Sequence, residues 1–323
     1  MKRGNILYIV VPCYNEQEVL HETTKRLTDK LNRMVKDKLI SDKSRIMYVN
    51  DGSKDKTWEI IEELNKENKY VYGVKLSRNR GHQNALLAGL MTAKEYADVV
   101  ISMDADLQDD IEVLDKFMNE YYDGCEVVYG VRSSRKKDTF FKRTTALGFY
   151  KLMKNLGVDI VYNHADYRLM SKRAIEELAN YKEVNLFLRG IIPLIGFKSS
   201  IVEYERNERF AGESKYPLKK MLNFALEGIL SFSVKPLRLI TTVGFTIAFL
   251  SLLFLIYVIV GHFLSHNVEG WTTIVTLICF FGGFQIFCIG IIGEYIGKIY
   301  QETKERPRFI IEKVVIENGK EVR

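Results

Sequence analysis

The segment Val99–Gln108, VVISMDADLQ, runs from a short apolar stretch directly into two carboxylates. A short apolar run of this kind is typical of a strand buried on both faces, as in a parallel sheet. Asp104 and Asp106 flank one alanine, so on an extended end both carboxylates can approach one cation, with Gln108 two positions further. Oxygen ligands at this spacing suit Mg²⁺ or Mn²⁺ that also binds substrate phosphates. A surface loop also explains such a triplet, although its position after a buried strand favours the metal site.

The same alternation of apolar runs and helical patterns continues on both sides of this segment. Strands separated by amphipathic helices indicate an α/β domain with a mainly parallel sheet. The expected strands are Ile6–Val11, Arg45–Val49, Val71–Leu76, Val99–Met103 and Val127–Val131. The expected helices are about 16–35, Lys56–Asn65 and about 83–97.

Polar clusters follow several of these strands at the point where each strand ends. They are PCYNE (Pro12–Glu16), NDGS (Asn50–Ser53), DADLQ and Arg132. In parallel sheets ligands bind beyond the carboxyl ends of the strands, so these clusters predict one site. Asp51 can hydrogen-bond a base or ribose there, but NDGS is also an ordinary turn sequence.

Basic residues are concentrated in two further segments. Arg132 and Arg135 lie in VRSSRKKDTFFKR, whose lysines 136 and 137 fit a solvated loop. RFAGESKYPLKK contains Arg209, Ser214 and Lys215 around a glycine, a composition that can bind phosphate through backbone N–H groups and charged side chains. Because this second segment precedes an apolar region, we also expect it near anionic lipid head groups.

Two uncharged apolar runs follow, Leu239–Gly261 and Trp271–Gly293. At about 1.5 Å per residue each is long enough as a helix to cross a hydrocarbon core of about 30 Å. The link between them carries no Lys or Arg, whereas both outer flanks do, so the positive-inside rule places residues 1–208 and both termini in the cytoplasm. We therefore expect a multi-pass protein of the plasma membrane, despite a mean hydropathy of only −0.09.

Composition excludes several other classes of protein. The chain has 323 residues, 47% of them hydrophobic, and a net charge of +6. These values exclude wholesale disorder and a small disulfide scaffold. The four cysteines show neither close pairing nor metal-ligand spacing, which indicates a reducing compartment.

Seven motifs occur in order along the chain: PCYNE (Pro12–Glu16), NDGS (Asn50–Ser53), SRNRGHQNALLAGL (Ser77–Leu90), MDADLQDD (Met103–Asp110), YGVRSSR (Tyr129–Arg135), ADYRLMSKRA (Ala165–Ala174) and RFAGESKYPLKKML (Arg209–Leu222). Together they resemble family 2 glycosyltransferases with the GT-A fold, a Rossmann-like α/β architecture. The subgroup is that of the polyprenyl-phosphate glycosyltransferases, the bactoprenol glucosyltransferase and dolichyl-phosphate-mannose-synthase-like enzymes. The resemblance covers about residues 5–310. Asp110 departs from the family pattern, where proline usually follows DLQD, and we expect it to alter a turn.

The resemblance implies a role for each motif. Pro12, Tyr14, Glu16 and Asp51 would bind the nucleotide, and Asp104, Asp106 and Gln108 would bind the metal and the sugar-nucleotide diphosphate. The phosphates of donor or acceptor would be bound by Arg132, Arg135, Arg209, Ser214 and Lys215. Asp166 and Arg168 would lie near the reacting sugar and the acceptor. A helix cap ahead of YRLMSKRAIEEL is the other interpretation of Asp166.

The function implied is an inverting, metal-dependent transfer of a hexose to undecaprenyl phosphate at the cytoplasmic membrane face. The expected donor is UDP-glucose, with UDP-GlcNAc and GDP-mannose as alternatives. The acceptor phosphate is already anionic near pH 7, so we expect Asp166 to position a substrate more than to remove a proton. A processive synthase is disfavoured, because no QxxRW-like motif is present and two spans are too few for a channel. A catalytically silent scaffold for a flippase is the alternative outside enzymes.

The expected organisation has four parts: a catalytic domain (1–208), a basic loop with an interfacial amphipathic helix (209–235), two transmembrane helices (236–297) and a cytoplasmic tail (298–323). Packing of 217–235 against the catalytic domain is the alternative to an interfacial helix. The expected partners are the nucleotide sugar, the lipid phosphate and the membrane, with a homo-oligomer such as a tetramer and a flippase and downstream glycosyltransferase in addition; no nucleic acid is expected.

Overall fold

The computed structural model describes residues 4–133, 164–205, 235–263, 270–317 and 320–321. Two compact units make up the chain. The larger unit joins most of the chain before residue 217 to residues 306–323, and the smaller unit contains the two long apolar helices.

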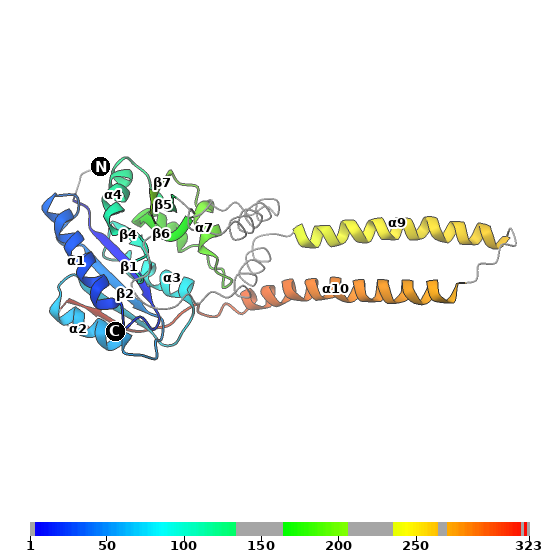
Figure 1. The fold of residues 1–323 in the computed structure, drawn as a ribbon, viewed down its shortest axis with the longest axis horizontal. Coiled ribbons are helices and arrows are strands. Elements are labelled where there is room, and N and C mark those ends of the chain that lie inside the picture. Colours follow the sequence, from blue (N-terminus) through cyan, green and yellow to red (C-terminus); the bar gives the residue numbers. More distant parts are fainter. Residues whose placement is uncertain (1–3, 134–163, 206–234, 264–269, 318–319, 322–323) are drawn as a thin grey trace. The chain divides into compact units, whose positions relative to one another are not determined.

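The larger unit is built on one mixed sheet with the order β7-β5-β6-β4-β1-β2-β3-β8-β9 (Figure 1). Parallel pairing joins β4 to β1, β1 to β2, β2 to β3 and β5 to β7, whereas β6, β8 and β9 pair antiparallel. The sheet is therefore more mixed than the N-terminal pattern alone predicts. The strands are β1 (Leu7–Cys13), β2 (Arg45–Asn50), β3 (Val71–Leu76), β4 (Val99–Ser102), β5 (Val127–Arg132), β6 (His164–Ser171), β7 (Ser199–Tyr204), β8 (Ile311–Ile316) and β9 (Lys320–Glu321).

The helices of this unit cover the sheet with their apolar sides. In α1, residues Leu20, Leu27, Leu31 and Met34 recur at helical spacing and are all buried. The helices are α1 (Leu20–Lys36), α2 (Thr57–Glu67), α3 (His82–Ala93), the 3-10 turn η1 (Ile111–Val113), α4 (Leu114–Tyr122), α6 (Lys172–Leu178) and α7 (Leu188–Leu194). The five strands and three helices expected from the sequence are all present, with ends that differ by a few residues.

Helix α3 lies unusually close to the sheet. A Cβ added at Gly89 would collide with the side chains of Val10 in β1 and Val49 in β2. Glycine thus lets the helix axis approach these two strands, which carry the polar clusters at their ends. His82 is the first residue of this helix, and its Nε2 lies 3.8 Å from Asp104 Oδ1, in the segment that follows β4.

The C-terminal residues complete the sheet, which the sequence did not predict. Strand β8 pairs antiparallel with β3, and the Ser77 N–H donates to the Ile310 carbonyl at 3.0 Å. Ion pairs from Lys75 to Glu312 (3.0 Å) and from Lys313 to Glu62 (2.8 Å) flank this edge. The segment expected as a tail therefore belongs to the same unit as the N-terminal strands.

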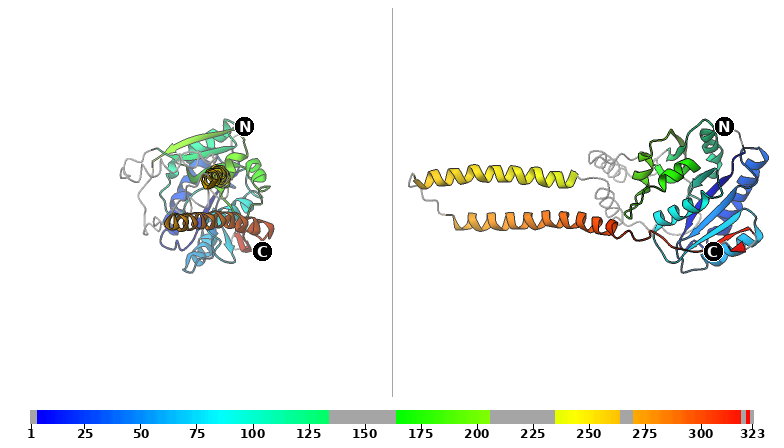
Figure 2. Two further views of the ribbon diagram at one scale, coloured as in Figure 1. Left: turned by 90° about the vertical axis from the view of Figure 1, so that its right-hand side faces the viewer. Right: turned by 180° about the vertical axis from the view of Figure 1, so that it is seen from behind.

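The smaller unit contains α9 (Lys235–Phe263) and α10 (Trp271–Thr303), coloured yellow and orange in Figure 2. Both are long and apolar enough to cross a membrane, and both contain the runs expected as spans. Large apolar side chains on them are open, for example Phe245 at 79% and Ile286 at 72% exposure. Such surfaces fit a lipid environment better than water.

Candidate active site

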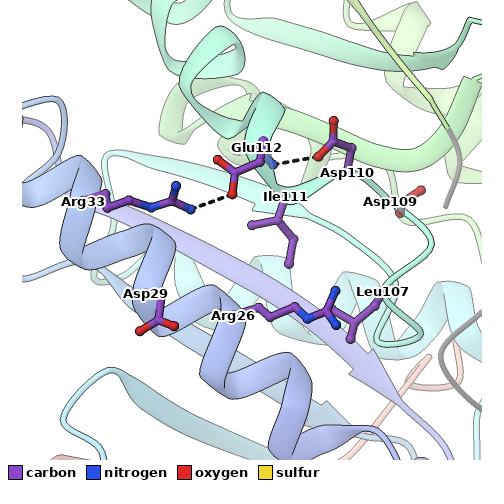
Figure 3. Close-up of a pocket in the computed structure, with 8 residues that line it drawn as sticks. All are labelled: Arg26, Asp29, Arg33, Leu107, Asp109, Asp110, Ile111 and Glu112. Carbon is purple, nitrogen blue, oxygen red and sulfur yellow. Dashed lines mark hydrogen bonds and ion pairs between the residues drawn. The ribbon is translucent and has the colours of Figure 1, made fainter.

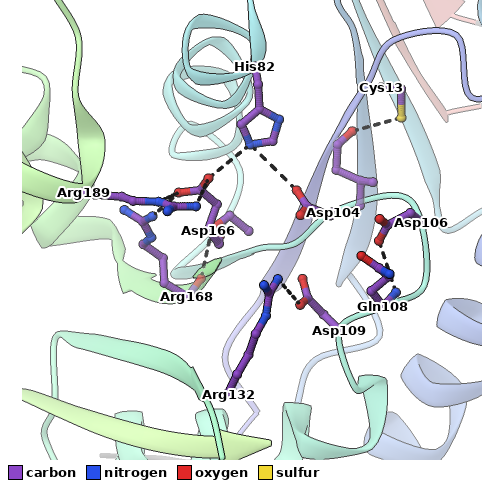
Figure 4. A network of polar contacts seen from close by, with 12 residues as sticks. Cys13, His82, Asp104, Asp106, Gln108, Asp109, Arg132, Asp166, Arg168 and Arg189 are labelled. Atoms are coloured by element: carbon purple, nitrogen blue, oxygen red, sulfur yellow. Dashed lines mark hydrogen bonds and ion pairs between the residues drawn. The ribbon is translucent and has the colours of Figure 1, made fainter. Parts of the chain in front are cut away.

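The two carboxylates after β4 lie on one side of their segment because buried and open residues alternate. Met103, Ala105 and Leu107 are anchored in the hydrophobic core, whereas Asp104, Asp106 and Gln108 are partly exposed between them. The Gln108 N–H donates to Asp106 Oδ1 at 3.1 Å, which keeps the turn closed (Figure 4). The structure thus brings together the three residues that the sequence singled out for a metal.

Oxygen donors in this arrangement fit a hard divalent cation. Burial raises the pKa of Asp104, and the charges of Asp166 and Asp106 raise it further while His82 opposes them. Carboxylates that repel one another in this way are stabilised by a cation between them. Among the described residues no group of three His, Cys, Asp or Glu side chains is arranged around one ion. Two carboxylates fill only part of the coordination shell of Mg²⁺, so a cation held here would also take oxygens from substrate or water, as Mg²⁺ does at phosphate sites.

Asp166 is the centre of a second cluster, composed mainly of cations (Figure 4). It lies on β6 beside β4, where Ser102 Oγ donates to the Asp166 carbonyl at 2.5 Å. Arg168 Nη2 contacts Oδ1 at 2.5 Å, and Arg189 donates Nε to Oδ1 at 3.3 Å and Nη2 to Oδ2 at 3.1 Å. Burial alone would raise the pKa of Asp166, but Arg189, His82 and Arg168 hold it well below its usual range. This carboxylate is therefore ionised and a weak base.

His82 connects the two clusters. Its Nε2 lies 3.5 Å from Asp166 Oδ2 and 3.8 Å from Asp104 Oδ1. Burial lowers the pKa of His82, but the hydrogen bond to Asp166 and the charge of Asp104 outweigh it and raise the pKa to about 9. The imidazole of His82 thus lies between the two acidic groups.

The structure shows whether Asp166 caps a helix and whether Arg168 is accessible to a substrate. Asp166 does not cap a helix: it lies within β6, and Ser171 Oγ accepts the Ala174 N–H at 3.0 Å to cap α6. Arg168, expected near the sugar, is only 1% exposed and lies behind Asp166. In this structure Arg168 supports Asp166 from the interior of the domain.

Arg132 lies at the end of β5, as expected, and two other side chains hold it. Its Nε donates to Tyr204 Oη at 3.3 Å, and its Nη2 lies 3.7 Å from Asp109 Oδ1. Tyr204 Oη in turn donates to Asp109 Oδ1 at 2.6 Å. Burial raises the pKa of Asp109 to about 6, with the charge of Asp104 adding to the effect. This trio couples β5 and β7 to the segment that carries Asp104 and Asp106.

The loops after β1 and β2 form the other side of the site. Asn15 Oδ1 accepts the Lys54 N–H at 2.9 Å, and the Glu16 N–H donates to Thr57 Oγ1 at 2.9 Å. Of the residues expected to bind the nucleotide, Tyr14 is 38% exposed and Pro12 is part of β1. The loops thus form one connected surface that carries Tyr14 and Glu16.

Asp51 has a structural role that is visible in its contacts. It is 2% exposed, and its two oxygens accept the Arg80 N–H at 2.7 Å and the Gly81 N–H at 2.9 Å. A Cβ at Gly52, where φ is +61°, would come within 2.5 Å of Asn79 N, so glycine permits this close approach. Asp51 therefore fixes the loop before α3, and its contact with a nucleotide stays a prediction.

A cavity of about 290 Å³ lies on the α1 side of the segment 107–112 (Figure 3). Asp110 accepts the Glu112 N–H at 2.9 Å and caps η1, so the residue that departs from the family pattern does shape a turn. Arg33 pairs with Glu112 on the same rim.

Four residues predicted to bind phosphate lie outside the described residues, namely Arg135, Arg209, Ser214 and Lys215, as does 217–234 of the expected interfacial helix.

The sequence patterns assigned no role to four residues that the structure brings to the site, namely His82, Arg189, Asp109 and Tyr204. His82 and Asp109 lie inside quoted motifs, which was the one available signal. Arg189 and Tyr204 carry no such signal, because only the fold brings them to the site.

Comparisons with known proteins agree with this architecture. The sequence profile of "Glycosyl transferase family 2" matches residues 8–179, and that of "GtrB C-terminal hairpin" matches residues 235–299. The chain is 57% identical to "Uncharacterized glycosyltransferase YkoT" of Bacillus subtilis (strain 168), over 95% of this chain and 91% of that protein. It is 40% identical to "Bactoprenol glucosyl transferase" of Shigella phage SfX, over 94% and 97% respectively. A solved glucosyl-3-phosphoglycerate synthase from Mycobacterium tuberculosis matches 70% of this chain and 77% of its own, at 16% identity and a TM-score of 0.45, which is too distant to bear on function.

Proposed function

Because the chain belongs to glycosyl transferase family 2 and has its GT-A fold, we propose that it transfers a hexose from a nucleotide sugar to a polyprenyl phosphate. The expected donor is UDP-glucose. Relatives that cover almost the whole chain and are described as bactoprenol glucosyl transferases support this acceptor. The observation that carries the proposal is the juxtaposition of Asp104 and Asp106 with the cationic cluster around Asp166.

The acidic half of the site suits the donor. Asp104, Asp106 and Gln108 would hold Mg²⁺ or Mn²⁺ together with the donor's diphosphate. When bound, the cation would neutralise the diphosphate and stabilise it as a leaving group. The loops after β1 and β2 would bind the nucleotide through Tyr14, Glu16 and Asp51, and Arg132 would contact phosphate oxygens from the end of β5.

The cationic half suits an anionic acceptor. A phosphate monoester carries between one and two negative charges near pH 7, so its oxygen can attack the anomeric carbon without first losing a proton. A weakly basic Asp166 is consistent with such an acceptor, since proton removal contributes little. Direct attack displaces the nucleoside diphosphate in a single step and inverts the anomeric centre.

Attachment to the membrane through α9 and α10 would bring such a site near its lipid. Residues on both sides of α9 and α10 belong to the larger unit, and β8 pairs with β3 after the second helix. This connectivity supports an even number of membrane crossings, with the catalytic domain and the C-terminal strands on one side. The cytoplasm is the side that the positive-inside rule favours. The predicted homo-oligomer, flippase and downstream transferase stay predictions.

The test is to incubate membranes containing the full chain with undecaprenyl phosphate and radiolabelled UDP-glucose, UDP-GlcNAc or GDP-mannose in parallel. We expect label in the lipid fraction with UDP-glucose and none with the Asp104→Asn variant. Label with another donor would correct the sugar and keep the reaction. Label in polymer, or no label with any donor, would refute the proposed function.

A further inference from the structure

Gln83 joins the start of α7 to helix α3, and we propose that it is a positioning residue for sugar transfer, holding Arg189 against Asp166. This inference rests on the proposed function and adds to it a residue that acts through Arg189 and Asp166. Gln83 lies in the motif Ser77–Leu90, for which the sequence suggested no role at the site.

The hydrogen bond from α7 to Gln83 replaces an ordinary helix cap. The first N–H groups of a helix have no acceptor within it, and a side chain at the N-cap position usually accepts one of them. In α7 the N-cap residue is Phe187, whose apolar side chain cannot do this. The Leu188 N–H instead donates to Gln83 Oε1 at 2.8 Å. Leu188 is fully buried, so water would replace this acceptor poorly.

Arg189 follows this capped N–H, and it orients the carboxylate of Asp166. Its Nε lies 3.3 Å from Oδ1, and its Nη2 lies 3.1 Å from Oδ2. Two contacts of this kind fix the plane of a carboxylate as well as its position. Both would lengthen beyond hydrogen-bonding range if the first turn of α7 moved away by about 1 Å. Gln83 therefore controls the orientation of Asp166 through the first turn of α7.

Gln83 is itself fixed at the start of α3. The loop before this helix is held by Asp51, whose two oxygens accept backbone N–H groups at 2.7 and 2.9 Å. Consecutive residues of a helix point about 100° apart, so His82 faces Asp166 directly while Gln83 faces α7. The first turn of α3 thus supports Asp166 by two routes. Support of this kind from packed elements keeps a reacting site in its productive geometry.

Loss of the Gln83 acceptor should act on turnover more than on nucleotide binding. Asp166 lies with His82 beside Asp104, where the sugar and the acceptor would meet. The nucleotide would bind instead to the loops after β1 and β2, which are joined to each other by the contact of Asn15 with the Lys54 N–H. A shift of α7 therefore leaves those loops in place and disturbs the reacting end of the site.

The test measures kcat and both KM values in the purified full chain for Gln83→Met, Gln83→Glu, Arg189→Met and the double variant Gln83→Met/Arg189→Met. Gln83→Met should lower kcat about tenfold, the value of a buried N–H that loses its acceptor, and change the KM for the nucleotide sugar less than about twofold. Gln83→Glu keeps an acceptor oxygen and should retain kcat within about threefold of the wild type. Because Gln83 acts through Arg189, the double variant should lose no more kcat than Arg189→Met alone.

Ser171→Ala is the matched control, because it removes the cap of another helix. Ser171 Oγ accepts the Ala174 N–H at 3.0 Å at the start of α6, and Ser171 pairs with Val99, at the end of β4 far from Asp104. Ser171→Ala and Gln83→Met should each lower the Tm by about 2–4 °C, the effect of one lost cap. Of these two variants, only Gln83→Met should lower kcat.

An unchanged kcat in Gln83→Met would overturn the assignment, as would a double variant in which the two losses multiply. A loss in Gln83→Glu as large as in Gln83→Met would show that the acceptor oxygen is not responsible, and would overturn it too. An equal loss of kcat in Ser171→Ala would assign the effect to stability instead of positioning, with the same consequence. Absence of lipid product in the wild type would instead refute the proposed function itself.

Discussion

Asp166→Asn should destabilise the domain more than Arg168→Met, although the two residues form one buried ion pair. Arg168 is 1% exposed and lies 2.5 Å from Asp166 Oδ1. Among the described residues its Nε and Nη1 have no hydrogen-bond partner, so nothing else compensates its charge. Removing one member of a buried ion pair costs about 3–5 kcal/mol. Asparagine keeps an oxygen for Arg168, so we expect about 3 kcal/mol for Asp166→Asn, the lower end of that range.

The partner substitution should cost much less. In Arg168→Met the buried guanidinium disappears, and Asp166 still contacts Arg189 and His82. We expect a loss of about 1 kcal/mol or less, because the substitution removes a buried charge while Asp166 keeps two other cationic partners and is not left unpaired. The double variant Asp166→Asn/Arg168→Met should therefore be more stable than Asp166→Asn alone.

Thermal unfolding of the purified full chain in detergent, followed by near-ultraviolet circular dichroism, measures these differences. A loss of about 3 kcal/mol corresponds to a Tm lower by about 6–12 °C for a domain of this size. The reasoning fails if Arg168→Met lowers the Tm as much as Asp166→Asn does. It also fails if the double variant is no more stable than the Asp166→Asn single variant.

Four further outcomes follow from the site and the sheet. Chelation with EDTA should abolish sugar transfer, Mg²⁺ or Mn²⁺ should restore it, and Asp104→Asn should stay inactive with either ion; full activity in EDTA would contradict the metal assignment. Gly52→Ala should cost about 1–3 kcal/mol in thermal unfolding, because φ is +61° and the new Cβ would meet Asn79 N; an unchanged Tm would contradict this. Deleting residues 306–323 should expose the β3 edge and cause aggregation in size-exclusion chromatography, whereas Glu312→Gln, which removes only the ion pair to Lys75, should not. Tyr204→Phe removes the hydroxyl that binds Asp109 at 2.6 Å and should cost about 1–2 kcal/mol and lower the turnover; a variant with normal unfolding and normal turnover would show that Arg132 needs no such support.

Local patterns in the sequence predicted the parts of the fold that local physics determines. Buried parallel strands such as β1 and β4 are continuous apolar runs, and α1 shows the spacing of an amphipathic helix. After β4, buried and open residues keep alternating with the two-residue period of a strand. This period predicted that Asp104 and Asp106 lie on the same side of the segment. The two uncharged runs predicted α9 and α10 in the same way, because length and apolar composition are local properties of the sequence.

Long-range pairing accounts for what the sequence did not predict. Strand β8 joins β3 only because the chain returns to the sheet after α10, and no local pattern encodes that partner. Arg189 reaches Asp166 because α7 packs beside α3 through Leu188 and Gln83. Likewise, Tyr204 reaches Asp109 through the parallel pairing of β7 with β5. Contacts of this kind depend on how the elements assemble.

Mass spectrometry of the lipid made by the purified full chain tests the central claim most directly. Undecaprenyl phosphate and UDP-glucose should yield a polyprenyl phosphate that carries a single hexose, together with UDP in equal amount. Free glucose with unmodified lipid would show that the chain only hydrolyses the donor. A lipid bearing several sugars, or no reaction with any nucleotide sugar, would contradict transfer of one sugar to a lipid phosphate.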